Sequence, residues 1–188
     1  MDTNVEKPKG QMLKQAMNYG LIFGVILIAF SVLQWALNLS MESFMSYISY
    51  AIMIACLYFF ARKYRDEHTN GHISYGKAFK FSAFTLLFAS FVLAFYTFIF
   101  FKFIDPGMIE KILEKSREAM LNRNSELTEE QIDMAVSMQK KFMTPLMMFV
   151  GSLIGNYFFG ILFSLITSIF VMKKDKSMND SSTQQPIS

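Results

Sequence analysis

Residues 81–101 read FSAFTLLFASFVLAFYTFIFF and contain no Asp, Glu, Lys, Arg or His, although Lys80 and Lys102 flank them directly. A helix of this length rises about 30 Å, which is the thickness of the hydrocarbon core of a bilayer. The stretch shows no alternation of polar and apolar residues and is far longer than a strand of a membrane barrel. It therefore predicts a transmembrane helix, and it decides the class of the fold.

Three further stretches have the same character. Residues 19–39, 44–61 and 145–172 also lack Asp, Glu, Lys, Arg and His. The first of them is longer than the apolar core of a cleaved signal peptide, and it ends without a small-residue cleavage pattern. We therefore expect an all-α fold, an integral membrane four-helix bundle with spans at about 19–39, 44–61, 81–101 and 145–172.

The composition agrees with a membrane protein that also has a polar part. Of the 188 residues, 53% are hydrophobic and 18% are charged, whereas an average soluble domain has about 25% charged residues. A single Cys excludes a disulfide framework and a thiolate metal cage. A net charge of +3 does not indicate a nucleic-acid partner. The expected environment of the chain is the lipid bilayer.

The polar part lies between the third and fourth spans, where residues 102–144 carry seven basic and eight acidic side chains. Asp105 and Pro106 are typical of a helix N-cap and of the first helical position. Thr128 opens a Thr-Glu-Glu-Gln capping box. Apolar residues recur at helical spacing after both signals. Residues 105–143 are therefore expected to form an amphipathic helical hairpin outside the membrane.

The distribution of Lys and Arg predicts the orientation. Eleven of these residues lie in the leader 1–18, in 62–80 and in the tail 173–188, whereas seven lie in 102–144 among many acids. Because basic residues concentrate on the cytoplasmic side, we expect both termini in the cytoplasm and an extracytoplasmic hairpin. Residues 19–172 would form one membrane domain, and the Ser-, Asn- and Gln-rich tail is expected to be disordered.

Reactive groups are sparse. His68 and His72 have a spacing that can bind a metal on a helix face, but Asn70 and Gly71 between them indicate a turn. Solvated loop histidines are the simpler interpretation. No phosphate-binding loop, nucleophile elbow or paired-acid motif occurs. We name no catalytic, cofactor-binding or metal-binding residue, and we expect no cofactor and no enzymatic activity.

Polar groups inside the spans are few. Gln34, Asn156 and Tyr157 are the strongest of them, and Ser and Thr residues supply weaker ones. Hydrogen bonds between membrane helices average less than about 1 kcal/mol, so helix packing is a simpler role for these groups than a substrate path. No charged residue within a span marks a proton pathway.

Two glycine pairs have the G-x-x-x-G spacing that lets helix backbones approach closely. Gly20 and Gly24 lie in the first span, and Gly151 and Gly155 lie in the fourth. We favour packing within the chain over homodimerisation for both pairs, and each pair must meet a different neighbour.

Five basic residues between the second and third spans are candidate contacts for anionic lipid head groups, namely Arg62, Lys63, Arg65, Lys77 and Lys80. Orientation by the positive-inside rule alone explains them equally well.

Four stretches resemble a known family. They are residues 62–67 (RKYRDE), 71–79 (GHISYGKAF), 103–106 (FIDP) and 138–145 (MQKKFMTP). Together they are similar to the domain of unknown function 4199 family, small four-span membrane proteins of Bacteroidota, over about residues 12–173. The resemblance implies the cytoplasmic membrane of a bacterium. It implies no activity, so no functional residue is carried over from the family.

Two functional hypotheses follow. The first is a non-enzymatic structural or interaction protein that uses 105–143 as a docking surface, with a membrane partner protein or a second copy of the chain. Caps, helical stripes and glycine pairs, rather than reactive groups, favour it. The second is a subunit of a small-molecule or lipid transporter or channel. It requires a polar cavity bordered by Gln34, Asn156 and the Ser and Thr residues.

Overall fold

The computed structural model describes residues 8–123 and 128–173, so residues 1–7 of the predicted leader and 174–188 of the predicted tail lie outside the described part. Six α-helices and one π-helix make up most of the described chain. They are α1 (Pro8–Ala36), α2 (Ser43–His68), α3 (Tyr75–Ile99), the π-helix (Phe100–Ile104), α4 (Met108–Arg123), α5 (Glu129–Phe142) and α6 (Pro145–Val171). No strand occurs in these residues, and the prediction of an all-α fold is confirmed.

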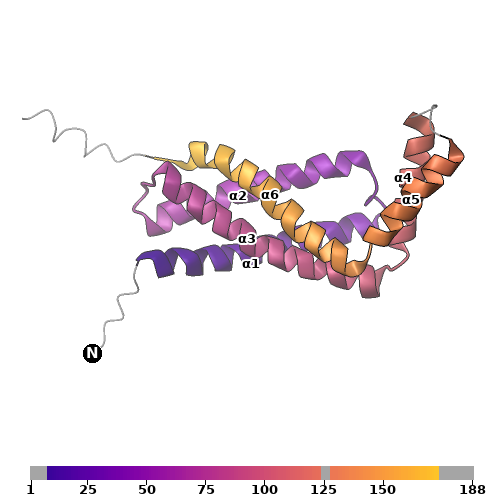
Figure 1. Ribbon diagram of the computed structural model, residues 1–188. Coiled ribbons are helices and arrows are strands. Elements are labelled where there is room, and N and C mark those ends of the chain that lie inside the picture. The colour runs from indigo at the N-terminus through magenta and orange to yellow at the C-terminus, as the bar shows by residue number, and fades with distance from the viewer. Residues whose placement is uncertain (1–7, 124–127, 174–188) are drawn as a thin grey trace, which may run out of the picture.

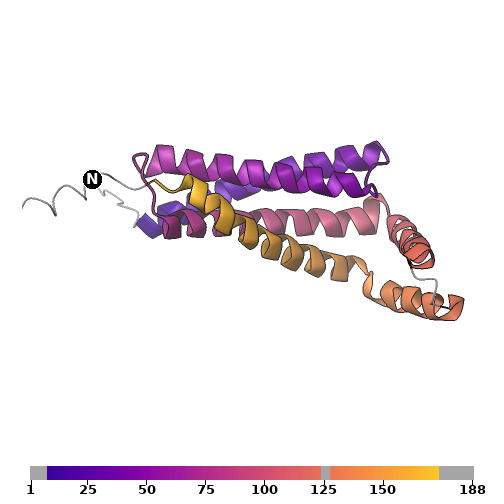
Figure 2. The same cartoon turned by 90° about the horizontal axis from the view of Figure 1, so that it is seen from above.

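Four helices are long and apolar enough to cross a membrane, namely α1, α2, α3 with the π-helix that continues it, and α6. They run side by side, while α4 and α5 form a hairpin that projects from one end of the bundle (Figure 1; Figure 2). The predicted four-helix membrane bundle with a hairpin between spans 3 and 4 is confirmed. We call this end of the molecule the hairpin end, and the other end, where α1 begins and α6 ends, the terminal end.

The helices extend beyond the predicted spans at the terminal end. The helix α1 begins at Pro8 rather than at Tyr19, so the described part of the leader is helical, and α2 continues past Ala61 to His68. An uncharged run measures the hydrocarbon core, whereas a helix can continue into the head-group region with charged side chains. In α2 these side chains form pairs four residues apart, Arg62 with Asp66 and Lys63 with Glu67.

The connection between α2 and α3 is therefore a short turn rather than a loop over residues 62–80. Asn70 and Gly71 have positive φ angles of 51° and 76°, as the Asn-Gly pair predicts. Ile73 and Lys173 exchange two backbone hydrogen bonds of 3.0 Å in an isolated bridge. This bridge ties the turn to the end of α6.

The helix α3 packs against both α1 and α6 and occupies the centre of the bundle. Small residues allow this close approach. A Cβ atom added to Gly20 of α1 would lie 2.6 Å from the Thr85 carbonyl oxygen, and one added to Gly24 would lie 2.8 Å from Val92. On the other side, a Cβ atom on Gly160 of α6 would lie 2.9 Å from Leu86.

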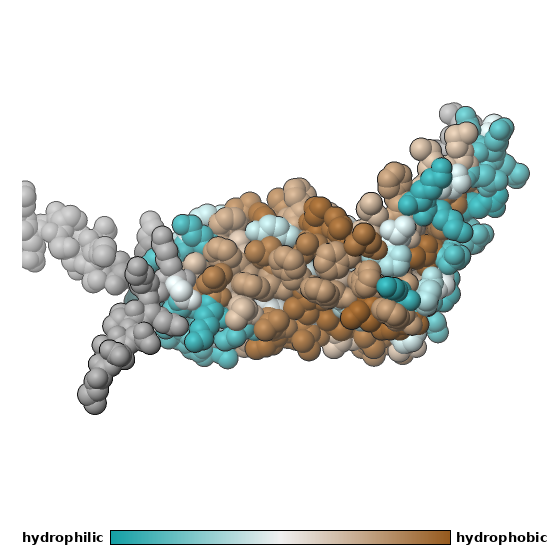
Figure 3. All heavy atoms as spheres, turned by 60° about the horizontal axis from the view of Figure 1, so that its bottom comes forward, coloured by the Kyte–Doolittle hydropathy of each residue, from teal (hydrophilic) through white to brown (hydrophobic). Residues whose placement is uncertain are grey.

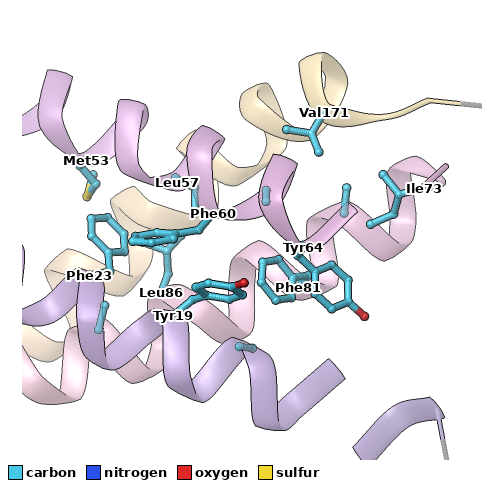
Figure 4. Packing of buried hydrophobic residues seen from close by; sticks show 14 residues of the cluster. Tyr19, Phe23, Met53, Leu57, Phe60, Tyr64, Ile73, Phe81, Leu86 and Val171 are labelled. Carbon is cyan, nitrogen blue, oxygen red and sulfur yellow. The ribbon is translucent and has the colours of Figure 1, made fainter. Parts of the chain in front are cut away.

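Aromatic rings fill the terminal half of the bundle. We call Tyr19, Phe23, Phe60, Tyr64 and Phe81 the aromatic cluster; all five are buried (Figure 4). Tyr64 and Phe81 stack with their ring centroids 4.0 Å apart, and Tyr19 lies 5.3 Å from Phe60. The cluster joins α1, α2 and α3 and supplies the large aromatic side chains of the core.

The predicted capping box at Thr128 is confirmed, and a second Thr caps the span that follows the hairpin. Thr128 forms the capping box of α5 with Gln131, and Thr144 accepts a hydrogen bond from the Met147 N–H at 3.3 Å at the start of α6. Asp105 lies just before α4, and its carboxylate accepts a backbone hydrogen bond from Met108 as a capping residue does, but the helix starts two residues later than the predicted Pro106. The helix α4 begins at Met108 because residues 106 and 107 form a turn.

Candidate functional site

A cavity of about 200 Å³ lies among α1, α2, α3 and α6 in the half of the bundle nearer the hairpin. It is lined by Leu27, Phe30, Ser31, Gln34, Ser49, Tyr50, Met53, Leu93, Tyr96, Thr97, Ser152 and Asn156. Two of the three strongest polar residues that the sequence places at depth, Gln34 and Asn156, therefore border one space, whereas Tyr157 packs against the hydrophobic core. A cavity of this size can hold several water molecules or a small molecule.

Hydrogen bonds link one wall of the cavity. The Asn156 amide donates to Ser152 Oγ at 3.0 Å, and Thr97 Oγ1 lies 3.2 Å from the same hydroxyl. Thr97 also donates to the Leu93 carbonyl at 2.9 Å, which is four residues earlier in α3. This wall is fixed by α3 and α6, whose polar side chains bond to each other across the helix interface.

Two further polar side chains at the cavity, one on α3 and one on α1, have no hydrogen-bond partner in the part of the chain that the structure describes. The buried Tyr96 hydroxyl has no hydrogen-bond partner among the described residues. Gln34 is half-buried, and its side-chain amide makes no hydrogen bond to the described part of the chain either. Because a buried polar group without a partner costs about 1–3 kcal/mol, these groups favour a polar occupant of the cavity.

The cavity continues toward the hairpin end. An adjoining space of about 240 Å³ shares Gln34 and Tyr96 with it and reaches Trp35 and Met108. A third space of about 180 Å³ shares Trp35 with the second and extends to Lys111. Shared lining residues thus link three neighbouring spaces from the middle of the bundle to the hairpin end, and we call the outer part around Trp35 the cavity entrance.

Asp105 links α1 and α4 at the cavity entrance. Its carboxylate accepts hydrogen bonds from Trp35 Nε1 at 3.1 Å and from Lys111 Nζ at 3.3 Å. The Trp35 hydrogen bond, helped by Lys111, holds the pKa of Asp105 below its ordinary value, and desolvation opposes this shift only in part. Lys115 of α4 also contacts the Met41 carbonyl oxygen. The first turns of α4 are thereby fixed beside the end of α1.

The other end of the cavity is closed in the described structure. Met53 lines the cavity and also belongs to the buried core, where Leu57 and the aromatic cluster follow it toward the terminal end. On this side the cavity is therefore bounded by packed side chains.

A family model described as protein of unknown function (DUF4199) matches residues 18–173. The chain belongs to the DUF4199 family. No curated protein and no solved structure matches it. The family resemblance predicted from the four sequence stretches is confirmed, and the coarse assignment as a multi-pass membrane protein follows from the four apolar helices.

The two glycine pairs of the DUF4199 chain have different surroundings. Gly20 and Gly24 lie directly against α3. A Cβ atom on Gly151 or Gly155 would meet nothing within 4 Å. The second pair therefore leaves open space on α6 and contacts no other helix in the described structure.

The candidate lipid-contact residues lie away from the cavity, at the terminal end. Arg65 differs from the others because only 14% of its side chain is exposed. It donates to Asp66 Oδ1 at 2.7 Å and to the Val171 carbonyl at 3.1 Å, which fixes the end of α6. Lys63 pairs with Glu67 and lies over the Tyr19 ring. Lys77 and Lys80 of α3 form no ion pair with the described residues.

The histidines of this DUF4199 chain do not form a shared site. His68 stacks on the ring of Tyr64, and His72 Nδ1 lies 3.0 Å from the Asn70 carbonyl oxygen. Within residues 8–123 and 128–173, no three His, Cys, Asp or Glu side chains gather at metal-binding distance.

Sequence reasoning missed Tyr96 and the contact between Trp35 and Asp105. Tyr96 gave no signal because a single Tyr in an aromatic span is ordinary. The position of Asp105 directly after a span suggested a cap, and nothing in the sequence pointed to Trp35, which is 70 residues earlier.

Proposed function

We propose that the protein is a non-enzymatic subunit of a small-molecule or lipid transporter or channel, and that the polar cavity binds the transported molecule. The observation that carries the proposal is the shared cavity of Gln34 and Asn156 with the unpartnered hydroxyl of Tyr96. A membrane protein whose helices only had to pack would have no reason to leave these groups around an open space.

The chemistry of the walls indicates the class of ligand. Every polar side chain that lines the inner cavity is a neutral hydroxyl or amide. An ion is strongly disfavoured at this depth unless a charged partner stabilises it. The fitting occupant is an uncharged molecule with several hydrogen-bonding groups, or the uncharged polar part of a lipid. The charged pair of Asp105 and Lys111 lies only at the entrance.

The proposed orientation gives the direction of entry. The basic residues of α2 and α3 lie at the terminal end, where α1 begins and α6 ends (Figure 1). The positive-inside rule then favours cytoplasmic termini in the cytoplasmic membrane of a bacterium, with the cavity open to the outside. Because packed side chains bound the cavity toward the terminal end, a ligand would leave on that side only after the helices move or through another subunit.

The test is native mass spectrometry of the full-length protein extracted gently from its own membranes. We expect a bound neutral molecule on the wild-type protein, and much less of it on the Q34M and N156L variants, which keep side-chain size but remove the amide. The control is I154L on the exposed face of the same helix. Equal retention of the bound molecule by all four proteins would refute binding in this cavity.

The sequence ranked a structural or interaction role first, with 105–143 as the docking surface. This role stays a prediction. The cavity moves the transport hypothesis ahead of it, because the required arrangement of Gln34 and Asn156 is present.

A further inference from the structure

A row of exposed apolar side chains follows one side of α5. Met134, Met138 and Phe142 are each more than half exposed. Residues four apart on a helix drift by only about 40° around its axis, so the three side chains share one face. A soluble surface rarely carries such a continuous apolar row without a partner. We call Met134, Met138 and Phe142 the α5 stripe.

The other two sides of α5 are accounted for. Ile132 is buried, on the side of α5 that packs against α4. Asp133, Ser137 and Lys140 are exposed on the side opposite the α5 stripe, and Asp133 pairs there with Arg117 of α4 at 3.0 Å. The helix therefore has one packed side, one polar side and one apolar side, and only the apolar side lacks a suitable environment in water.

The α5 stripe continues into the apolar surface of the spans. Leu146 follows Phe142 by four residues and, with Ile154 further along α6, is among the most exposed apolar residues of that span. At the other root of the hairpin, Phe103 of the π-helix is also more than half exposed. Both connections between the hairpin and the bundle thus present apolar side chains where the membrane surface would lie.

The shape of the molecule places the hairpin along that surface. The hairpin extends sideways from the end of the bundle instead of continuing along its axis (Figure 1). In Figure 3 hydrophilic residues gather along its outer side, and apolar residues lie along the side turned toward the apolar band of the bundle. A hairpin that served a partner in solution would not need this arrangement.

We propose that the hairpin lies on the bilayer surface at the hairpin end, with the α5 stripe inserted at the boundary between lipid head groups and acyl chains. Amphipathic helices bind membranes in this way, with the apolar side a few ångströms below the head groups. Lys141 near the root of α5 lies at the level of anionic head groups, whereas Glu129 and Glu130 begin the helix at its far end. The proposal does not depend on what the cavity binds.

The test compares neighbouring positions on the two faces of α5. In a Cys56→Ala background, which removes the only Cys, the M138C and S137C variants of the full chain are labelled with a bimane fluorophore. Each protein is placed as a single copy in nanodiscs of phosphatidylcholine and phosphatidylglycerol. Both positions are exposed in the isolated protein, so neither substitution should disturb folding.

We expect bimane at position 138 to be quenched severalfold more by head-group nitroxide lipid than by aqueous iodide, and the reverse at position 137. Equal access of iodide to both positions would overturn the proposal. Protection of position 138 only when two copies share a disc would instead assign the α5 stripe to a second copy of the chain. Protection only in native membranes would assign it to a protein partner, and either result rejects the lipid surface.

Discussion

The two halves of the bundle use the same four helices for different purposes. In the terminal half, stacked rings such as Tyr64 and Phe81, with centroids 4.0 Å apart, fill the space between α1, α2 and α3. In the hairpin half, hydroxyl and amide side chains such as Ser152 and Asn156 leave a cavity of about 200 Å³. We call the terminal half the packed half and the hairpin half the open half. The same apolar helices form both.

From this difference we expect the packed half to determine the stability of the bundle and the open half to bind the proposed ligand. Without water between helices, membrane bundles depend on close packing more than on burial of apolar surface. The packed half supplies that contact through glycines and aromatic rings, whereas the helices of the open half surround a polar cavity and are joined there by hydrogen bonds such as that of Thr97 and Ser152. Substitutions should therefore separate the two halves, with large effects on stability in one and small effects in the other.

The largest effect is expected in the aromatic cluster. Phe81 is fully buried and contacts Tyr64 and Tyr19, so Phe81→Ala leaves a cavity and should cost about 3–5 kcal/mol of unfolding free energy. The matched control is Phe170→Ala, which removes an exposed ring near the same end of the bundle and should cost less than about 1 kcal/mol. Unfolding of both variants in mixed micelles measures the difference, and equal losses would contradict a packed terminal half.

The contact of α1 with α3 gives the next largest effect. A Cβ atom on Gly20 would lie 2.6 Å from a backbone oxygen that cannot easily move, so Gly20→Ala should destabilise the protein by about 1–3 kcal/mol. Gly155→Ala is the control, because its Cβ atom meets open space. Alanine is the better helix former, so this variant should be neutral or slightly more stable. Thermal unfolding compares the two, and a reversed order would show that α1 does not pack on α3 as described.

The open half should respond differently. Asn156→Leu removes one hydrogen bond within α6, to Ser152, and even a hydrogen bond between membrane helices contributes only about 0.6 kcal/mol on average. We expect its thermal unfolding to stay close to that of the wild-type protein, while binding of the neutral ligand is lost. A stability loss comparable to that of Phe81→Ala would mean that Asn156 serves packing, as its sequence position alone suggested.

The sequence predicts where the helices lie along the chain, but it does not predict which sides of them face one another. Uncharged runs identify the four spans, because the bilayer requires them, and the Thr128 and Thr144 caps mark the starts of α5 and α6. The spans are apolar on nearly every side, so their sequences do not indicate which side of each helix faces its neighbours. The meeting of Gln34 and Asn156 depends on those rotations. The second role of Asp105 could not be predicted, because its partner Trp35 belongs to another helix.

The smallest effect concerns the entrance, where Asp105 should make the surroundings of Trp35 sensitive to acid. The pKa of Asp105 lies below its ordinary value of 3.8, first because Trp35 donates to the carboxylate. A lowered pKa means that the folded protein prefers the ionised form, so this stabilisation is present above the ordinary value and is lost as pH falls through the folded-state pKa. Trp35 is the only Trp, so its emission reports this contact directly.

We therefore expect the emission of Trp35 to stay constant from neutral pH down to about pH 5 and to shift only below about pH 4. Asp105→Asn keeps an acceptor for the indole N–H but cannot titrate in this range, so its emission should lack the acid transition. A transition centred near neutral pH in the wild-type protein, or one that persists in the Asn variant, would mean that another group controls the entrance. Because α4 is joined to α1 through this carboxylate, the same titration also shows whether the entrance loosens while the aromatic cluster stays folded.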